Sequence, residues 1–170
     1  HSSSAMYSFA VTPSGQPAVC YNTGYSPPTT PHFAAITTKN GGTWDTEYIY
    51  EHAQRVSELL FTQNGSPVIG LSHPEIYYKD GDNWMSISDN DFRGSAYDYD
   101  ILPDDSVIAC GGFSYFQNPA NFGCAKTVGS GWSAFNEIEL NTASIKYLGD
   151  SQYGIAHIQT DLCNDDHRLT

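Results

Sequence analysis

Short runs in which apolar and polar residues alternate recur along the chain, and turn residues separate them. In residues 43–50, Trp44, Thr46 and Tyr48 would share one face of a strand, and the residues between them would lie on the other face. No segment has a convincing helical period. The nearest candidate, residues 47–60 (EYIYEHAQRVSELL), is interpreted as a loop followed by a strand. The hydrophobic pattern therefore predicts an all-β chain.

One strand–turn–strand unit is repeated along the chain. Residues 8–21 (SFAVTPSGQPAVCY) align with residues 57–71 (SELLFTQNGSPVIGL), and the two share a serine, the apolar alternation, a glycine and a proline two residues later. Residues 95–112 form a third copy, with Asp105 in place of the glycine, and residues 144–158 form a fainter fourth. Each copy predicts two antiparallel strands joined by a tight turn.

A second pattern marks another turn. Each tryptophan follows a glycine by three residues and a lysine by five or six. The three sets are Lys39, Gly41 and Trp44; Lys79, Gly81 and Trp84; and Lys126, Gly129 and Trp132. Because a β-prone run precedes each glycine, we predict that this turn joins the third and fourth strands of a unit. Four-stranded units of about 40–50 residues are typical of β-propeller blades.

The predicted blades are residues 7–50, 51–90 and 91–140, and residues 141–158 supply two strands of a fourth. These amount to about 3.5 blades, which is fewer than the four to eight of a closed propeller. The chain is then a fragment of a longer propeller, or one half of a dimeric seven-bladed ring. A third explanation, in which the polar tail 159–170 completes a four-bladed ring, is the weakest.

The units resemble the repeats of secreted bacterial β-propellers. The turn at 37–44 also resembles a degenerate Asp-box of the sialidase-type (BNR) propellers, whose pattern is S-x-D-x-G-x-T-W. Thr37, Gly41, Thr43 and Trp44 match this pattern, and Lys39 stands where the Asp-box has its aspartate. The resemblance implies a propeller fold, and it implies activity only weakly because propellers host many unrelated functions.

The composition limits the classes of partner. Lys and Arg total 7 against 19 Asp and Glu, which gives a formal net charge of −12. Such an acidic chain is a poor match for nucleic acid or for an anionic membrane surface, and no apolar run approaches the roughly 20 residues of a membrane-spanning helix. The abundance of Tyr, Ser, Thr, Asn and Gly resembles secreted bacterial β-proteins and favours an extracellular or periplasmic location. Residues 1–6 (HSSSAM) resemble the remnant of an expression tag and were set aside.

In a propeller, the long loops gather on one face, away from the Gly-Pro and Gly-Trp turns, and functional residues concentrate there. The ligand-binding candidates on this face are Tyr25, Tyr50, His52, Arg55, Phe92, Arg93, Tyr115, Phe116 and Asn118. The aromatic residues are candidates for stacking on sugar rings, and the amides for bonding to hydroxyls. The alternative is that the aromatic residues pack between blades.

The two arginines of this set have equivalent places in the repeat. Arg55 and Arg93 each precede the first serine of a unit by two residues. One interpretation is that the two guanidinium groups form an anion clamp at the mouth of the central axis. The other is that they neutralise acidic neighbours in the loops.

The chain offers no recognisable metal or cofactor site. The acidic clusters do not fit a calcium-binding loop, and no cofactor is expected. Cys110 and Cys124 flank one long loop, so antiparallel pairing would bring them opposite each other as a disulfide. The alternative is a pair of buried free thiols.

Taken together, the sequence favours a non-enzymatic propeller module that binds carbohydrate or another small ligand, with a homodimer as one route to ring closure. A sialidase-like or glycosidase-like hydrolase is the first alternative. A structural or protein-interaction propeller is the second.

Overall fold

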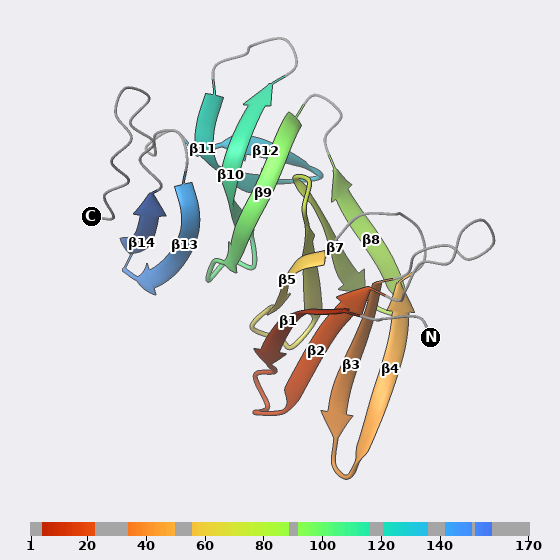
Figure 1. Cartoon of the computed structure of the whole chain (residues 1–170). Coiled ribbons are helices and arrows are strands. Elements are labelled where there is room, and N and C mark those ends of the chain that lie inside the picture. Colours follow the sequence, from red (N-terminus) through yellow and green to blue (C-terminus); the bar gives the residue numbers. More distant parts are fainter. Residues whose placement is uncertain are drawn as a thin grey trace, which may run out of the picture.

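The computed structural model describes residues 5–22, 34–49, 56–88, 92–115, 121–135, 142–150 and 152–157. All of the regular structure in these residues is β-strand, which confirms the all-β prediction. Three four-stranded antiparallel sheets follow one another along the chain, and a two-stranded hairpin follows them (Figure 1). Within the described residues, the sheets do not close into a ring.

Each sheet is a meander in which sequential strands are neighbours. The first sheet contains β1 (Ala5–Val11), β2 (Pro17–Asn22), β3 (Ala34–Asn40) and β4 (Thr43–Ile49). The second contains β5 (Val56–Phe61), β6 (Pro67–Leu71), β7 (Glu75–Asp80) and β8 (Asn83–Ser88). The third contains β9 (Phe92–Ile101), β10 (Val107–Tyr115), β11 (Asn121–Val128) and β12 (Gly131–Ala134). The hairpin contains β13 (Thr142–Gly149) and β14 (Gln152–His157). β1 thus includes two residues of the segment that was set aside as a tag remnant.

The glycine before each tryptophan forms the predicted hairpin turn. Gly41, Gly81 and Gly129 have φ values of 60°, 60° and 59°, and each is the first of two residues between paired strands. Glycine reaches positive φ without the steric cost of a Cβ atom, which explains its recurrence at this position.

The strand register defines equivalent positions in the four repeats. Val11 pairs with Pro17, Phe61 with Pro67, Ile101 with Val107 and Tyr147 with Tyr153. The residues two positions before the first member of each pair are therefore equivalent to one another. They are Phe9, Leu59, Tyr99 and Ile145. One residue before these four stand Ser8, Glu58, Asp98 and Ser144.

The core is divided among the three joints between consecutive sheets. The first joint buries Cys20, Ile36, Leu59 and Ile69, and the second buries Val68, Ile76, Tyr99 and Trp132. The third joint buries Cys110, Cys124 and Ile145, with Phe135, Tyr147 and Tyr153 packed against them. The second and third sheets therefore each present one face to the sheet before them and the other face to the element after them.

Polar side chains also link one first strand to the next. The Leu59 N–H donates to Ser8 Oγ at 2.9 Å, and the Ile145 N–H donates to Asp98 Oδ2 at 3.0 Å. Because Ser8 and Asp98 are equivalent, as are Leu59 and Ile145, this is one contact used at two joints. It fixes the lateral position of each sheet against its neighbour.

Candidate functional site

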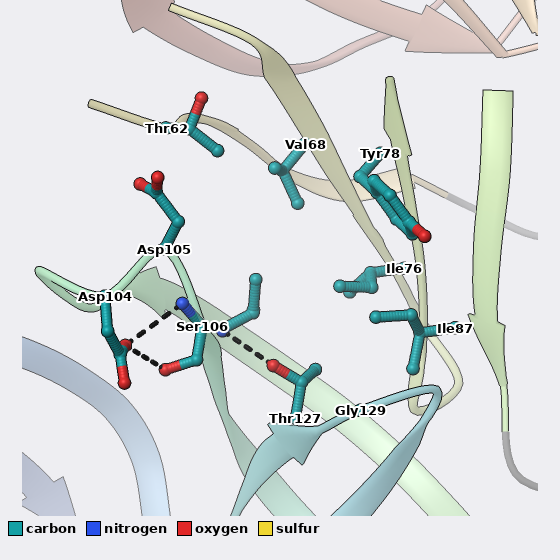
Figure 2. Close-up of a pocket in the computed structure, with 11 residues that line it drawn as sticks. Thr62, Val68, Ile76, Tyr78, Ile87, Asp104, Asp105, Ser106, Thr127 and Gly129 are labelled. Carbon is teal, nitrogen blue, oxygen red and sulfur yellow. Dashed lines mark hydrogen bonds between the residues drawn. The ribbon is translucent and has the colours of Figure 1, made fainter. Parts of the chain in front are cut away.

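A groove of about 340 Å³ lies at the joint between the second and third sheets (Figure 2). Its lining residues are Thr62, Val68, Ile76, Tyr78, Ile87, Asp104, Asp105, Ser106, Val107, Thr127 and Gly129. The volume falls within the range of about 300–1,000 Å³ that is usual for small-molecule sites. The residues come from strands β6, β7, β8, β10 and β11 and from the turns at one end of the two sheets.

The two walls of the groove differ in chemistry. The second sheet contributes Val68, Ile76, Ile87 and the aromatic ring of Tyr78. Figure 2 shows these side chains facing the turn of the third sheet, which carries polar residues such as Asp105. The groove therefore offers an apolar wall to one side of a ligand and hydrogen-bonding groups to the other.

At the first joint, side chains of an ion pair occupy the place that is equivalent to the groove. There, Lys79 Nζ lies 2.7 Å from Glu47 Oε2, and Trp84 Nε1 donates to Glu47 Oε1 at 3.0 Å. Lys79 stands opposite Trp84 on the neighbouring strand, and Glu47 stands opposite Ile36. A long cation and a carboxylate thus bridge the two sheets.

At the second joint, this bridge is absent because the two positions have changed. Thr127 stands opposite Trp132, where the lysine would be, and Ile87 stands opposite Ile76, where the glutamate would be. The short Thr127 side chain turns inward, and its Oγ1 accepts a hydrogen bond from the Val107 N–H at 2.9 Å. Both residues line the groove. The groove thus follows from two specific changes in the repeat.

The sequence pattern assigned the repeat lysine of the third unit one residue too early. Lys126 pairs with Ser133, not with Trp132, so strand alternation directs it to the other face of the sheet. There, its Nζ lies 3.1 Å from Asp104 Oδ2. The residue equivalent to Lys79 is Thr127.

Asp105 has an unusual backbone conformation at the rim of the groove. Its φ is 61°, where the equivalent turns have Gly15 and Gly65. Its Oδ1 accepts a hydrogen bond from the Gln63 N–H at 3.0 Å, which ties the turn of the third sheet to the turn of the second. A non-glycine residue in this conformation carries strain, and such strain concentrates at functional sites. The replacement of glycine by aspartate was visible in the sequence and could have indicated this site.

Asp104, beside it, is held in its charged form. Its Oδ1 bonds to the Ser106 hydroxyl and accepts from the Ser106 N–H at 3.1 Å. These hydrogen bonds and the Lys126 ammonium lower the pKa of Asp104 to about 2. Asp104 is therefore ionised at neutral pH, with the Lys126 ammonium as its counter-ion.

A second group of carboxyls lies on the first strands. Glu58 hydrogen bonds to Asp98, and half-burial together with the charge of Asp98 raises the pKa of Glu58 to about 7. Asp98 accepts hydrogen bonds from the hairpin, and Asp100 accepts from Lys146 Nζ at 2.9 Å and from the Tyr147 N–H at 2.6 Å. The two aspartates therefore serve as contacts between the third sheet and the hairpin.

Three of the nine sequence-predicted ligand-binding residues lie in described strands. Arg93 is exposed on β9 opposite Ser114, and the backbone of Phe92 pairs with that of Tyr115. The strand register thus brings these three to one end of the third sheet. Tyr25, Tyr50, His52, Arg55, Phe116 and Asn118 lie outside the described residues. The sequence signals point to the long loops, whereas the groove lies beside the short turns at the other end of the sheets.

Cys110 and Cys124 are registered directly opposite each other on β10 and β11, as antiparallel pairing required. Both are buried, and neither forms a disulfide in this structure. Burial raises the pKa of Cys110 to about 12, which leaves little thiolate at neutral pH. The disulfide remains a prediction.

Among the described residues, no group of three or more histidine, cysteine, aspartate or glutamate side chains is arranged to hold a metal ion. The same residues contain no helix that could cross a membrane. Neither the protein-family models nor the curated proteins include a match to this chain.

Proposed function

We propose that this protein is a non-enzymatic binding module of the β-propeller type and that it recognises carbohydrate in the groove between the second and third sheets. The observation that carries the proposal is the pairing of an apolar wall with a charged, hydroxyl-bearing rim in a groove of about 340 Å³. Three consecutive four-stranded meanders, each packed face to face on the next, support the propeller architecture.

The groove matches the surface of a sugar. A pyranose ring has an apolar C–H face, which suits Tyr78 and Ile87, and a rim of hydroxyls that donate and accept hydrogen bonds. Charged carboxylates are strong acceptors for hydroxyl donors, and Asp105 lies on the side opposite the apolar wall. Asp104 beside it already bonds to Ser106 and Lys126. Thr62 adds a hydroxyl at the same rim.

The proposed binding site lies beside the turns instead of in the long loops. The proposed ligand is carbohydrate in both cases. Arg93, Phe92 and Tyr115 at the other end of the third sheet mark the competing location. An extracellular or periplasmic setting, supported by the composition alone, would give the module access to glycans.

A glycan array with matched variants tests both the function and its place. The double variant Ile87→Glu/Thr127→Lys would rebuild the bridge of the first joint inside the groove, and we expect it to lose sugar binding. Thr43→Lys places a lysine at an exposed position at the start of β4 in the first sheet, away from the groove, and should bind as the original protein does. Loss of binding in Arg93→Ala with retention in the double variant would instead locate the sugar on the long-loop face.

The hydrolase alternative draws on Glu58, whose pKa of about 7 suits a general acid. Asp98 and Asp100, the carboxyls beside it, are occupied by contacts to the hairpin. Release of free sugar from a bound glycan, abolished by Glu58→Gln, would favour the hydrolase over the binding module.

A further inference from the structure

The outer face of the first sheet exposes positions that the other repeats bury. Phe9 is 57% exposed, whereas its equivalents Leu59, Tyr99 and Ile145 are 1%, 2% and 2% exposed. Trp44 is 53% exposed, and its equivalent Trp132 is 5% exposed. Val11 and Tyr48 are also exposed, at 55% and 48%. We call Phe9, Val11, Trp44 and Tyr48 the open face.

The internal joints show what covers such a face. At each joint, the equivalent residues pack on the opposite face of the preceding sheet of the same kind. An exposed apolar surface of four large side chains is unusual for a soluble protein and marks an interaction site. The repeat therefore indicates that the open face packs against another sheet of the same repeat type.

The other end of the series presents the complementary face. On the hairpin, Leu148 is 64% exposed and its side chain lies over Gly154. Ser144 is exposed on the same face. Ser144 is equivalent to Ser8, whose hydroxyl accepts the Leu59 N–H at the first joint. The Ser144 hydroxyl donates its proton to Asp98 Oδ2 of the same chain, and its oxygen keeps lone pairs that can accept the N–H of Phe9, the residue equivalent to Leu59.

We propose that the open face is covered by the β13–β14 hairpin of a second copy of this chain. Ser144 of one copy accepts from the Phe9 N–H of the other, and Leu148 packs against Val11. Because each copy has one open face and one hairpin, two copies satisfy both contacts and close the assembly without leaving a free end. The ring then contains six four-stranded sheets and two hairpins, and these eight positions lie within the size range of closed propellers.

Light scattering on the purified protein tests the proposal through its mass. We expect twice the 18.7 kDa of the chain, and we expect Val11→Asp to give a folded monomer because it places charge in the contact. Val128→Asp is the matched control, since Val128 is a valine of similar exposure, 63%, on the third sheet. A monomer for the original protein, or a dimer that Val11→Asp leaves intact, would overturn the proposal.

Cross-linking gives a second readout that does not depend on affinity. An equimolar mixture of Val11→Cys and Leu148→Cys proteins should form an oxidised dimer that contains one chain of each, because these two residues are in contact in the proposed assembly. A mixture of Val11→Cys with Val128→Cys should not. Equal cross-linking in both mixtures would also count against the contact.

Discussion

Lys79 of the second sheet and Glu47 of the first form a 2.7 Å ion pair across their joint. At the next joint, Thr127 and Ile87 occupy the equivalent positions and line a groove. The same two repeat positions thus form an ion pair at the first joint and line a groove at the second. The difference between the two joints is the basis of the proposed function.

The stability of the first joint should depend moderately on the ion pair between Lys79 and Glu47. Both partners are partly exposed, so the ion pair alone contributes at most about 1 kcal/mol. Glu47→Ala also removes the acceptor of Trp84 Nε1, and we expect a total loss of about 1–2 kcal/mol in the free energy of unfolding. Denaturant titration measures it. A loss for Lys79→Met as large as that for Glu47→Ala would contradict this division.

The second joint should depend strongly on the Tyr99 hydroxyl. This buried group lies 2.6 Å from the Leu71 carbonyl oxygen and 2.8 Å from that of His73. Tyr99→Phe leaves buried carbonyls with one donor fewer, so we expect a loss of about 1–3 kcal/mol in the free energy of unfolding. Tyr97→Phe, on a ring that is 58% exposed, should change it by less than about 0.5 kcal/mol. Equal effects of the two substitutions would show that the hydroxyl is not a structural link.

Glu58 should make the protein less stable as the pH rises. Its folded pKa is raised from 4.5 to about 7, so between these values the folded state binds more protons than the unfolded state. The free energy of unfolding then falls as the pH increases from about 4.5 to about 7. Lys146 lowers and Asp98 and Asp100 raise the pKa of this carboxyl.

The difference between the original protein and Glu58→Gln isolates this contribution from those of other carboxyls. Thermal or denaturant unfolding of both at pH 4.5 and pH 7.5 gives the comparison. We expect the variant to lose less stability over this interval. An identical pH dependence in the two proteins would refute the raised pKa.

Asp105 should contribute more to the affinity for sugar than to the stability of the fold. Asp105→Gly relieves the strain of φ 61° and loses the hydrogen bond from Gln63, two effects of about 1 kcal/mol that oppose each other. We therefore expect nearly unchanged stability and at least a tenfold weaker affinity for sugar. Asp105→Ala keeps the strain and should be less stable than the glycine variant. Unchanged affinity in Asp105→Gly would remove this residue from the site.

Local sequence signals were sufficient for the sheets and insufficient for the groove. The glycines before the tryptophans and the apolar alternation predict the strands because backbone conformation depends on near neighbours. The assignment of Lys126 as the repeat lysine failed because a shift of one residue reverses the face of a strand. Only the register places Thr127 opposite Trp132.

The contrast between Phe9 and Leu59 was equally invisible in the sequence. Both are apolar, both occupy the same position of the repeat, and their exposures of 57% and 1% differ through the neighbouring sheet alone. Packing between sheets is a long-range property, so a repeat alignment cannot show which copy lacks a neighbour.

The central claim is that the groove binds sugar because the bridge of the first joint is missing there. Calorimetric titration of the strongest ligand from the array into the original protein, Ile87→Glu/Thr127→Lys and Thr43→Lys tests this directly, with unfolding temperatures confirming that all three are folded. The account predicts saturable binding to the original protein and to Thr43→Lys, and at least a hundredfold weaker binding to the double variant. Equal affinity in all three proteins, or no binding to the original protein, would contradict it.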